Sequence, residues 1–135
     1  MHSGKNAKVK VFPSNKNTGI NFVRTDLTGL PKIKACYKNV CDTNLGTTLC
    51  NFELENVKVR TVEHLMAALY GRGVDNALIE IDNDEVPIID GSSKFFVEKI
   101  DSVGLENSDK SIKIIKILKK IILKEGKKTI SMEPT

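Results

Sequence analysis

The chain has 135 residues, enough for one ordinary domain or for one domain and the beginning of another. Hydrophobic residues make up 40% and charged residues 28% of the sequence, which excludes a disordered chain and predicts a packed core. The net charge is +4, but residues 110–128 alone carry eight lysines against one glutamate, so contact of this basic segment with a nucleic acid or an anionic membrane is one function to weigh.

The first half of the chain contains several short predicted strands. Alternating side chains predict strands at residues 8–12 and 20–24, and the turn-like residues between them indicate a hairpin. A third extended piece is expected from Ile33 to Tyr37, after Pro31. A polar loop then leads into a threonine-rich strand that ends at Leu49, and a short return strand is expected at residues 57–60.

Residues 61–70 have the pattern of an amphipathic helix. Four apolar side chains follow the i, i+3, i+4, i+7 spacing that keeps one face against a core, namely Val62, Leu65, Met66 and Leu69. Thr61 is the expected N-cap, and Gly71 and Gly73 are expected to end the helix through a left-handed backbone.

Glu63 and His64 fall in the first turn of this helix, where amide N–H groups are unpaired and the helix dipole is positive. That field favours an ionised carboxylate and a neutral imidazole, the forms that a general base and a metal ligand need. The alternative is that Glu63 merely stabilises the dipole and His64 is an ordinary core or surface residue. One His-Glu pair is too few for zinc, which takes about four ligands, so the local pattern leaves both interpretations open.

The second half predicts one more strand and one more helix before a final ambiguous stretch. Residues 76–82 form a strand with Ala77, Ile79 and Ile81 on one face, and an acidic turn follows that lacks the glycine and distal glutamate of an EF-hand loop. Ser92 and Ser93 can cap a helix whose apolar face consists of Phe96, Ile100 and Val103. Residues 104–110 are polar and linker-like.

Residues 112–131 fit either a basic amphipathic helix on a membrane or a pair of strands. The density of isoleucine and the turn at Glu125-Gly126 favour strands. The sequence has no apolar run of transmembrane length and no signal-peptide core, which predicts a cytoplasmic protein without a transmembrane segment. Cys36, Cys41 and Cys50 are odd in number and lack C-x-x-C spacing, so free thiols are expected.

Six motifs together resemble one family, the zinc-dependent UDP-3-O-acyl-N-acetylglucosamine deacetylases of lipid A biosynthesis. They follow the order and spacing of that family over nearly the whole chain. The motifs are His2-Ser3-Gly4, Thr18-Gly19-Ile20 to Arg24-Thr25-Asp26, Asp42-Thr43 with Thr47-Thr48-Leu49, Thr61-Val62-Glu63-His64-Leu65, Gly73-Val74-Asp75-Asn76, and Glu85-Val86-Pro87-Ile88-Ile89-Asp90-Gly91-Ser92.

The resemblance implies an α+β fold, a two-layer sandwich of a mostly antiparallel sheet with two helices. Residues 1–107 would be a truncated first domain that lacks the first strand of the family. Residues 108–135 would be a linker and the opening strands of a second domain, with the active site in the cleft between the two domains. A missing strand would leave one sheet edge unpaired, which is an aggregation hazard.

The resemblance also assigns chemistry to individual residues. It implies that Glu63 is the general base and that His64 is one of three protein ligands of a Zn²⁺ cofactor. Zinc would polarise the amide carbonyl and a bound water, Glu63 would take the proton of that water, and the products would be acetate and the free 2-amino sugar. Asn44, Gly46 and Thr48 are expected to face the substrate, a UDP-sugar that carries an acyl chain.

The chain departs from this family in its histidines. The other two zinc ligands of the family and its general-acid histidine belong to the second domain, and no histidine follows His64 here. His2 is the only other histidine, and it belongs to a different motif. We therefore expect a fragment that is inactive alone. The alternatives are a non-catalytic interaction module that pairs with a separate second half, and a basic nucleic-acid or membrane binder, which the few aromatic residues disfavour.

Overall fold

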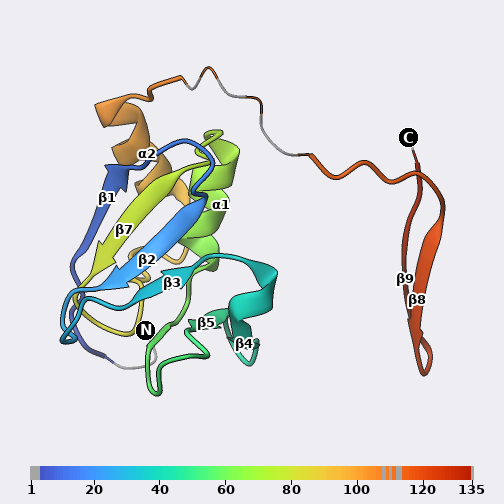
Figure 1. Ribbon diagram of the computed structural model, residues 1–135, viewed down its shortest axis with the longest axis horizontal. Coiled ribbons are helices and arrows are strands. Elements are labelled where there is room, and N and C mark those ends of the chain that lie inside the picture. The colour runs from blue at the N-terminus through green and yellow to red at the C-terminus, as the bar shows by residue number, and fades with distance from the viewer. Residues whose placement is uncertain (1–3, 108, 110, 112–113, 135) are drawn as a thin grey trace.

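A computed structural model describes residues 4–107, 109, 111 and 114–134 of the chain (Figure 1). Its larger part, called the body here, spans residues 4–107 and combines two helices with a four-stranded sheet. The strands of that sheet lie in the order β1-β7-β2-β3, and Figure 1 shows both helices behind it. The predicted two-layer α+β fold with a mostly antiparallel sheet is confirmed.

The central strands of this sheet are β7 (Ala77–Ile81) and β2 (Ile20–Arg24), and its edges are β1 (Val9–Pro13) and β3 (Lys32–Lys34). β7 pairs antiparallel with β1 and parallel with β2. The hairpin predicted between the first two strands is therefore wrong, because β7 lies between them. A strand as apolar as β7 is stabilised by a neighbour on each edge and by burial of its side chains.

The main core lies between β7 and helix α1 (Glu63–Gly71). Ile79 and Ile81 are fully buried, and Leu65 and Leu69 on α1 are each 1% exposed. Burial of each such side chain stabilises the fold by about 1.5–3 kcal/mol. The predicted apolar faces of both elements are confirmed. α1 ends at Gly71, which does not have a positive φ, so the expected left-handed termination is wrong for that glycine. It is confirmed at Gly73, which has φ 71° and donates its N–H to the carbonyl of Tyr70.

Helix α2 (Lys94–Val103) packs beside α1. Phe96 is buried and Ile100 packs partly buried against the core, as their spacing predicts. Val103 is 87% exposed, so the predicted apolar face is wrong at its last residue. Val103 is the last residue of α2, just before the C-cap Gly104, and no described residue covers its side chain.

A second, three-stranded sheet has the order β4-β5-β6. Its strands are β4 (Val40–Asp42), β5 (Thr48–Cys50) and β6 (Lys58–Val59). β5 and β6 confirm the predicted threonine-rich strand and its return strand. The third extended piece is shorter than predicted, because β3 ends at Lys34 and a 3₁₀ turn, η1, occupies Tyr37–Asn39.

The buried side chain of Arg24 connects the two sheets. Its Nη1 donates to the backbone carbonyl of Lys58 on β6 at 2.7 Å. Its Nε and Nη2 donate to the two carboxylate oxygens of Asp26 at 2.8 and 2.7 Å. These hydrogen bonds from Arg24 hold the pKa of Asp26 below its usual value. The pair therefore compensates a buried guanidinium while fixing β2 against β6.

A separate hairpin is formed by β8 (Ile121–Glu125) and β9 (Lys128–Met132), which pair antiparallel. Gly126 has φ 57° in the connecting turn. Strands rather than an amphipathic helix are thus confirmed for residues 121–132. Figure 1 shows the hairpin set apart from the body, and the described residues that connect them form no helix or strand.

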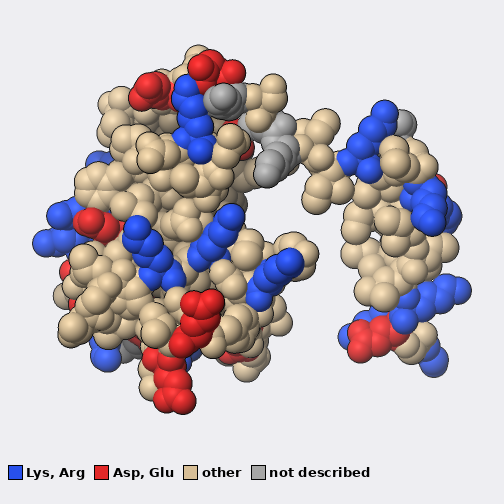
Figure 2. All heavy atoms as spheres, in the orientation of Figure 1, with Lys and Arg blue, Asp and Glu red and all other residues tan. Residues whose placement is uncertain are grey.

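The surface of the body mixes both signs of charge. On the face shown in Figure 2, basic and acidic side chains are interspersed over the body, whereas the charged side chains of the hairpin are mostly basic. Within the part of the chain that the structure describes, no helix is long and apolar enough to cross a membrane.

Candidate active site

Glu63 and His64 occupy the first turn of α1, as the sequence predicts. The carboxylate of Glu63 points back to the loop between β4 and β5, where its Oε2 accepts the backbone N–H of Thr47 at 3.0 Å. A second bond runs the other way, because the N–H of Val62 donates to the carbonyl of Thr47 at 3.3 Å. The loop and the start of the helix are therefore fastened together at the carboxylate.

Gly46 leaves room for the other carboxylate oxygen. A Cβ atom built on Gly46 would lie 3.3 Å from Oε1 of Glu63, closer than most real side-chain contacts. A side chain at residue 46 would therefore press on the carboxylate, which would have to shift by a few tenths of an ångström. The two carboxylate oxygens of Glu63 therefore have different surroundings. Oε2 accepts the hydrogen bond of the Thr47 amide, and Oε1 lies beside Gly46, which has no side chain.

His64 presents a buried nitrogen that lacks a partner. Its Nδ1 is inaccessible to solvent and has no hydrogen-bond partner among the described residues. A buried polar atom without a partner is costly, and a bound group or a further protein segment is the usual way to satisfy one. The described residues thus leave one ring nitrogen of His64 without a hydrogen bond.

The described residues do not complete a metal site around His64. Among residues 4–107, 109, 111 and 114–134, no cluster of three or more His, Cys, Asp and Glu side chains could hold a metal ion. Zinc in proteins takes about four ligands. His64 can therefore supply one ligand to zinc, and the described part of the chain does not supply the rest.

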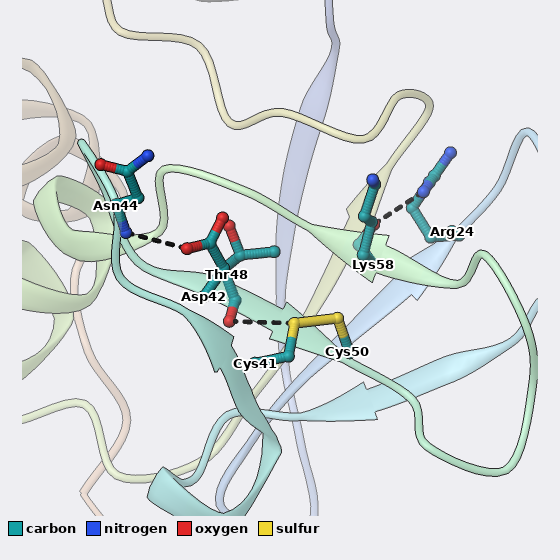
Figure 3. The surroundings of a disulfide bond; sticks show 7 residues. All are labelled: Arg24, Cys41, Asp42, Asn44, Thr48, Cys50 and Lys58. Carbon is teal, nitrogen blue, oxygen red and sulfur yellow. Dashed lines mark hydrogen bonds between the residues drawn. A yellow bond between two sulfur atoms is a disulfide. The ribbon is translucent and has the colours of Figure 1, made fainter.

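The three residues predicted to face the substrate lie around one small cavity beside Glu63. Its volume is about 120 Å³, and it is lined by Asp42, Asn44, Leu45, Gly46, Thr48, Arg60 and Thr61. Thr48 is buried, while Asn44 is exposed and donates its backbone N–H to Oδ1 of Asp42 at 2.9 Å. Figure 3 labels both residues and marks the hydrogen bond from Asn44 to Asp42. The structure brings the three residues together, and their role in substrate binding stays a prediction.

A disulfide bond joins the strands on either side of this loop. Cys41 on β4 and Cys50 on β5 are bonded, with their Cα atoms 5.9 Å apart (Figure 3). The prediction of free thiols is thus wrong for these two residues, whereas Cys36 is free. C-x-x-C spacing is not required for a disulfide, because the turn between paired strands brings residues nine positions apart into bonding geometry.

The prediction that Thr61 caps α1 is wrong. The N-cap is Val62, and no side chain caps the helix. The hydroxyl of Thr61 donates instead to Oε1 of Glu85 at 3.2 Å. Periodicity could not reveal this contact, although Thr61 and Glu85 both lie within motifs that the sequence singles out.

Two further motifs differ in how much of them is described. His2 and Ser3 lie outside the described residues. Asp90, in the motif that begins at Glu85, accepts hydrogen bonds from the hydroxyl and the backbone N–H of Ser92, and these bonds lower the pKa of its carboxyl group. The Oγ of Ser92 in turn accepts the N–H of Lys94, so this turn is fastened to the start of α2.

Comparison with known proteins agrees with the motifs. The family model for UDP-3-O-acyl N-acetylglycosamine deacetylase matches residues 1–135. The chain is 42% identical to the UDP-3-O-acyl-N-acetylglucosamine deacetylases of Teredinibacter turnerae and Shewanella halifaxensis, and each match covers 99% of the chain. The chain spans 43% of the length of each relative.

Proposed function

The chain belongs to the UDP-3-O-acyl N-acetylglycosamine deacetylase family, and we propose that it supplies the first-domain part of such an enzyme. The reaction is the hydrolysis of UDP-3-O-acyl-N-acetylglucosamine to the free amine and acetate, a step of lipid A biosynthesis. The observation that carries the proposal is the Glu63 carboxylate in the first turn of α1, held by the Thr47 amide, with His64 next to it.

Glu63 acts in this proposal as the general base. The Thr47 N–H occupies Oε2 and fixes the carboxylate in one orientation. Oε1 lies over Gly46 and is the oxygen positioned to take a proton from the attacking water. A fixed base of this kind contributes about 10²–10⁴-fold to a rate.

His64 is proposed as one ligand of a catalytic zinc ion. When bound, zinc supplies a Lewis acid that lowers the pKa of water and stabilises negative charge on the amide oxygen. The support from the structure is that no described residue hydrogen-bonds Nδ1 of His64, so the ring is not committed to a protein partner at that nitrogen. Asn44, Gly46 and Thr48 are proposed to contact the UDP-sugar from the cavity beside Glu63.

We propose that residues 1–107 belong to the first domain and that residues 108–135 lead into the second. The β8–β9 hairpin supports this division, because Leu123 and Ile130 lie opposite each other and are 68% and 62% exposed. Such a pair on one face of a hairpin is stabilised only when another layer covers it. The second domain would provide that layer and the remaining zinc ligands.

The proposed location is the cytoplasm. Thiols are mostly kept reduced in that compartment, and disulfides there are usually transient or redox-sensing. The Cys41–Cys50 bond therefore represents the oxidised form of the loop beside Glu63.

The function is tested by supplying the portion of a relative that the chain does not match. We would mix this chain with the portion of the Shewanella halifaxensis relative that the chain does not match, and measure release of acetate from UDP-3-O-acyl-N-acetylglucosamine. Zinc-dependent release is expected from the mixture, and no appreciable release from either part alone. Glu63→Gln should lower the rate of the mixture by at least about 100-fold.

Glu98→Gln is the matched control, because Glu98 lies on α2 in an exposed ion pair with Lys94. It should leave the rate unchanged. A mixture in which Glu63→Gln retains full activity would contradict the general-base role, and turnover by the unmixed chain would contradict the need for a second part.

A further inference from the structure

Thr61 has a backbone conformation that is unfavourable for its side chain. Its φ is 56°, in the left-handed region where a β-branched residue is a genuine outlier. Five other non-glycine residues of the described chain have positive φ values, and all five are partly or largely exposed: Asn17, Leu30, Leu45, Asn56 and Ile89. Thr61 is 4% exposed. An unfavourable conformation in a buried residue persists only when the surroundings fix it.

The surroundings of Thr61 fix it from two sides. Its hydroxyl donates to Glu85, which is also 4% exposed. The neighbouring backbone is paired with the same segment, because the N–H of Arg60 donates to the carbonyl of Asp84 at 2.8 Å and the N–H of Val86 donates to the carbonyl of Arg60 at 3.1 Å. Residues 84–86 therefore fix the backbone immediately before Thr61.

After Thr61 the chain turns directly into the catalytic helix. The next N–H, that of Val62, donates to the carbonyl of Thr47, and α1 begins at Glu63. A Cβ on Gly46 would lie 3.3 Å from Oε1 of Glu63 and 3.7 Å from Oγ1 of Thr61. Thr61, Gly46 and Glu63 thus meet at one point, and the direction of the chain at Thr61 determines where the Glu63 carboxylate falls.

We propose that Thr61 and Glu85 are positioning residues for Glu63. Their buried hydrogen bond holds Thr61 in the left-handed turn, and that turn aims the Glu63 carboxylate at the Thr47 amide. Neither residue touches the reacting atoms. A buried carboxylate is costly unless it is hydrogen-bonded, so a glutamate that served packing alone would be a poor choice at residue 85. The catalytic meaning of this positioning rests on the function proposed above, but the contact itself does not.

The test uses the Thr47 amide as a reporter of the Glu63 carboxylate. NMR would measure the exchange rate and proton chemical shift of this amide in Thr61→Val, which keeps the shape of the side chain and removes the hydroxyl. We expect exchange about tenfold faster and an upfield shift, because the Thr47-to-Glu63 hydrogen bond is weakened. Thr61→Ser keeps the hydroxyl and should restore both values to within about twofold of the original.

The amide of Ile79 in the central strand serves as the internal reference. A role in global stability alone would raise the exchange of Thr47 and Ile79 together, and that result would overturn the proposal. An unchanged Thr47 amide in Thr61→Val would overturn it as well. Should Thr61→Val not fold, Glu85→Gln weakens the acceptor and should produce the Thr47 change without the Ile79 change. Thr61→Gly adopts the left-handed turn without strain and should leave the Thr47 amide within about twofold of its original exchange rate.

These outcomes are independent of turnover. If the mixture of two parts fails to release acetate but the Thr47 amide responds to Thr61→Val, the positioning contact stands and the proposed function falls. If the mixture is active, Thr61→Val should lower kcat, because it moves the base, and Thr61→Ser should restore it.

Discussion

The body and the β8–β9 hairpin have strands of similar composition but very different burial. In β7, Ile79 and Ile81 are fully buried between the neighbouring strands and the helices. In β8, Ile121 and Leu123 are 49% and 68% exposed, although they pair in regular register with β9. Strand formation and core formation are therefore separate events. The first follows from local sequence, and the second requires partners that are distant in the chain.

The largest expected contrast between the two regions is the effect of removing a leucine side chain. Leu65→Ala on α1 should lower the free energy of unfolding by about 2–5 kcal/mol, because it opens a cavity in a closed core. Leu123→Ala on β8 should change it by no more than about 0.5 kcal/mol. Urea unfolding followed by circular dichroism measures both values.

The contrast should shrink when the second part is present. Leu123→Ala should then weaken association of the two parts, because the hairpin face becomes an interior surface. Equal losses of stability from the two substitutions in the chain alone would show that the hairpin already packs on the body in solution.

Local patterns predicted the elements that depend on short-range spacing. The apolar face of α1, the alternation in β7 and the turn at Gly126 were all available from the sequence, and so was the place of Glu63 and His64 in the first helical turn. Each depends on residues within about one or two turns of each other, where helix and strand periodicity is informative.

Long-range contacts account for two of the predictions that failed. The place of β7 between β1 and β2 depends on residues more than 50 positions apart in the sequence, and local alternation carries no signal for it. The Thr61 hydroxyl turns away from the helix because Glu85, 24 positions later, is its partner. A threonine hydroxyl before a helix can accept a hydrogen bond from a helix N–H or donate one to a distant acceptor. The sequence alone does not show which partner is near.

The Cys41–Cys50 disulfide is a crosslink that the body has and the hairpin lacks. Replacing both Cys41 and Cys50 by serine should lower the free energy of unfolding by about 2–3 kcal/mol, because the crosslink restricts a short loop in the unfolded chain. A dithiol reductant should act in the same direction, reducing the bond to two thiols while the dithiol is oxidised. Cys36→Ser is the control, since Cys36 is free, and should have little effect. Identical stability with and without reductant would exclude this constraint.

The smallest expected contrast is between the ion pairs of the two regions under acid. Asp26 in the body has a lowered pKa, so its pair with Arg24 stabilises the fold fully above the unfolded value of 3.8 and loses that contribution as the pH falls below it. In the Lys120–Glu133 pair beside the hairpin, each side chain is 56% exposed, and the pair should contribute nothing measurable.

Urea unfolding at pH 6 and at about pH 3 measures the free energy of unfolding that is lost in acid. This loss should be smaller for Asp26→Asn than for the unchanged chain, and the same for Glu133→Gln as for the unchanged chain. If Asp26→Asn loses as much stability on acidification as the unchanged chain, the acid sensitivity arises elsewhere and Arg24 is held mainly by its bond to the Lys58 carbonyl.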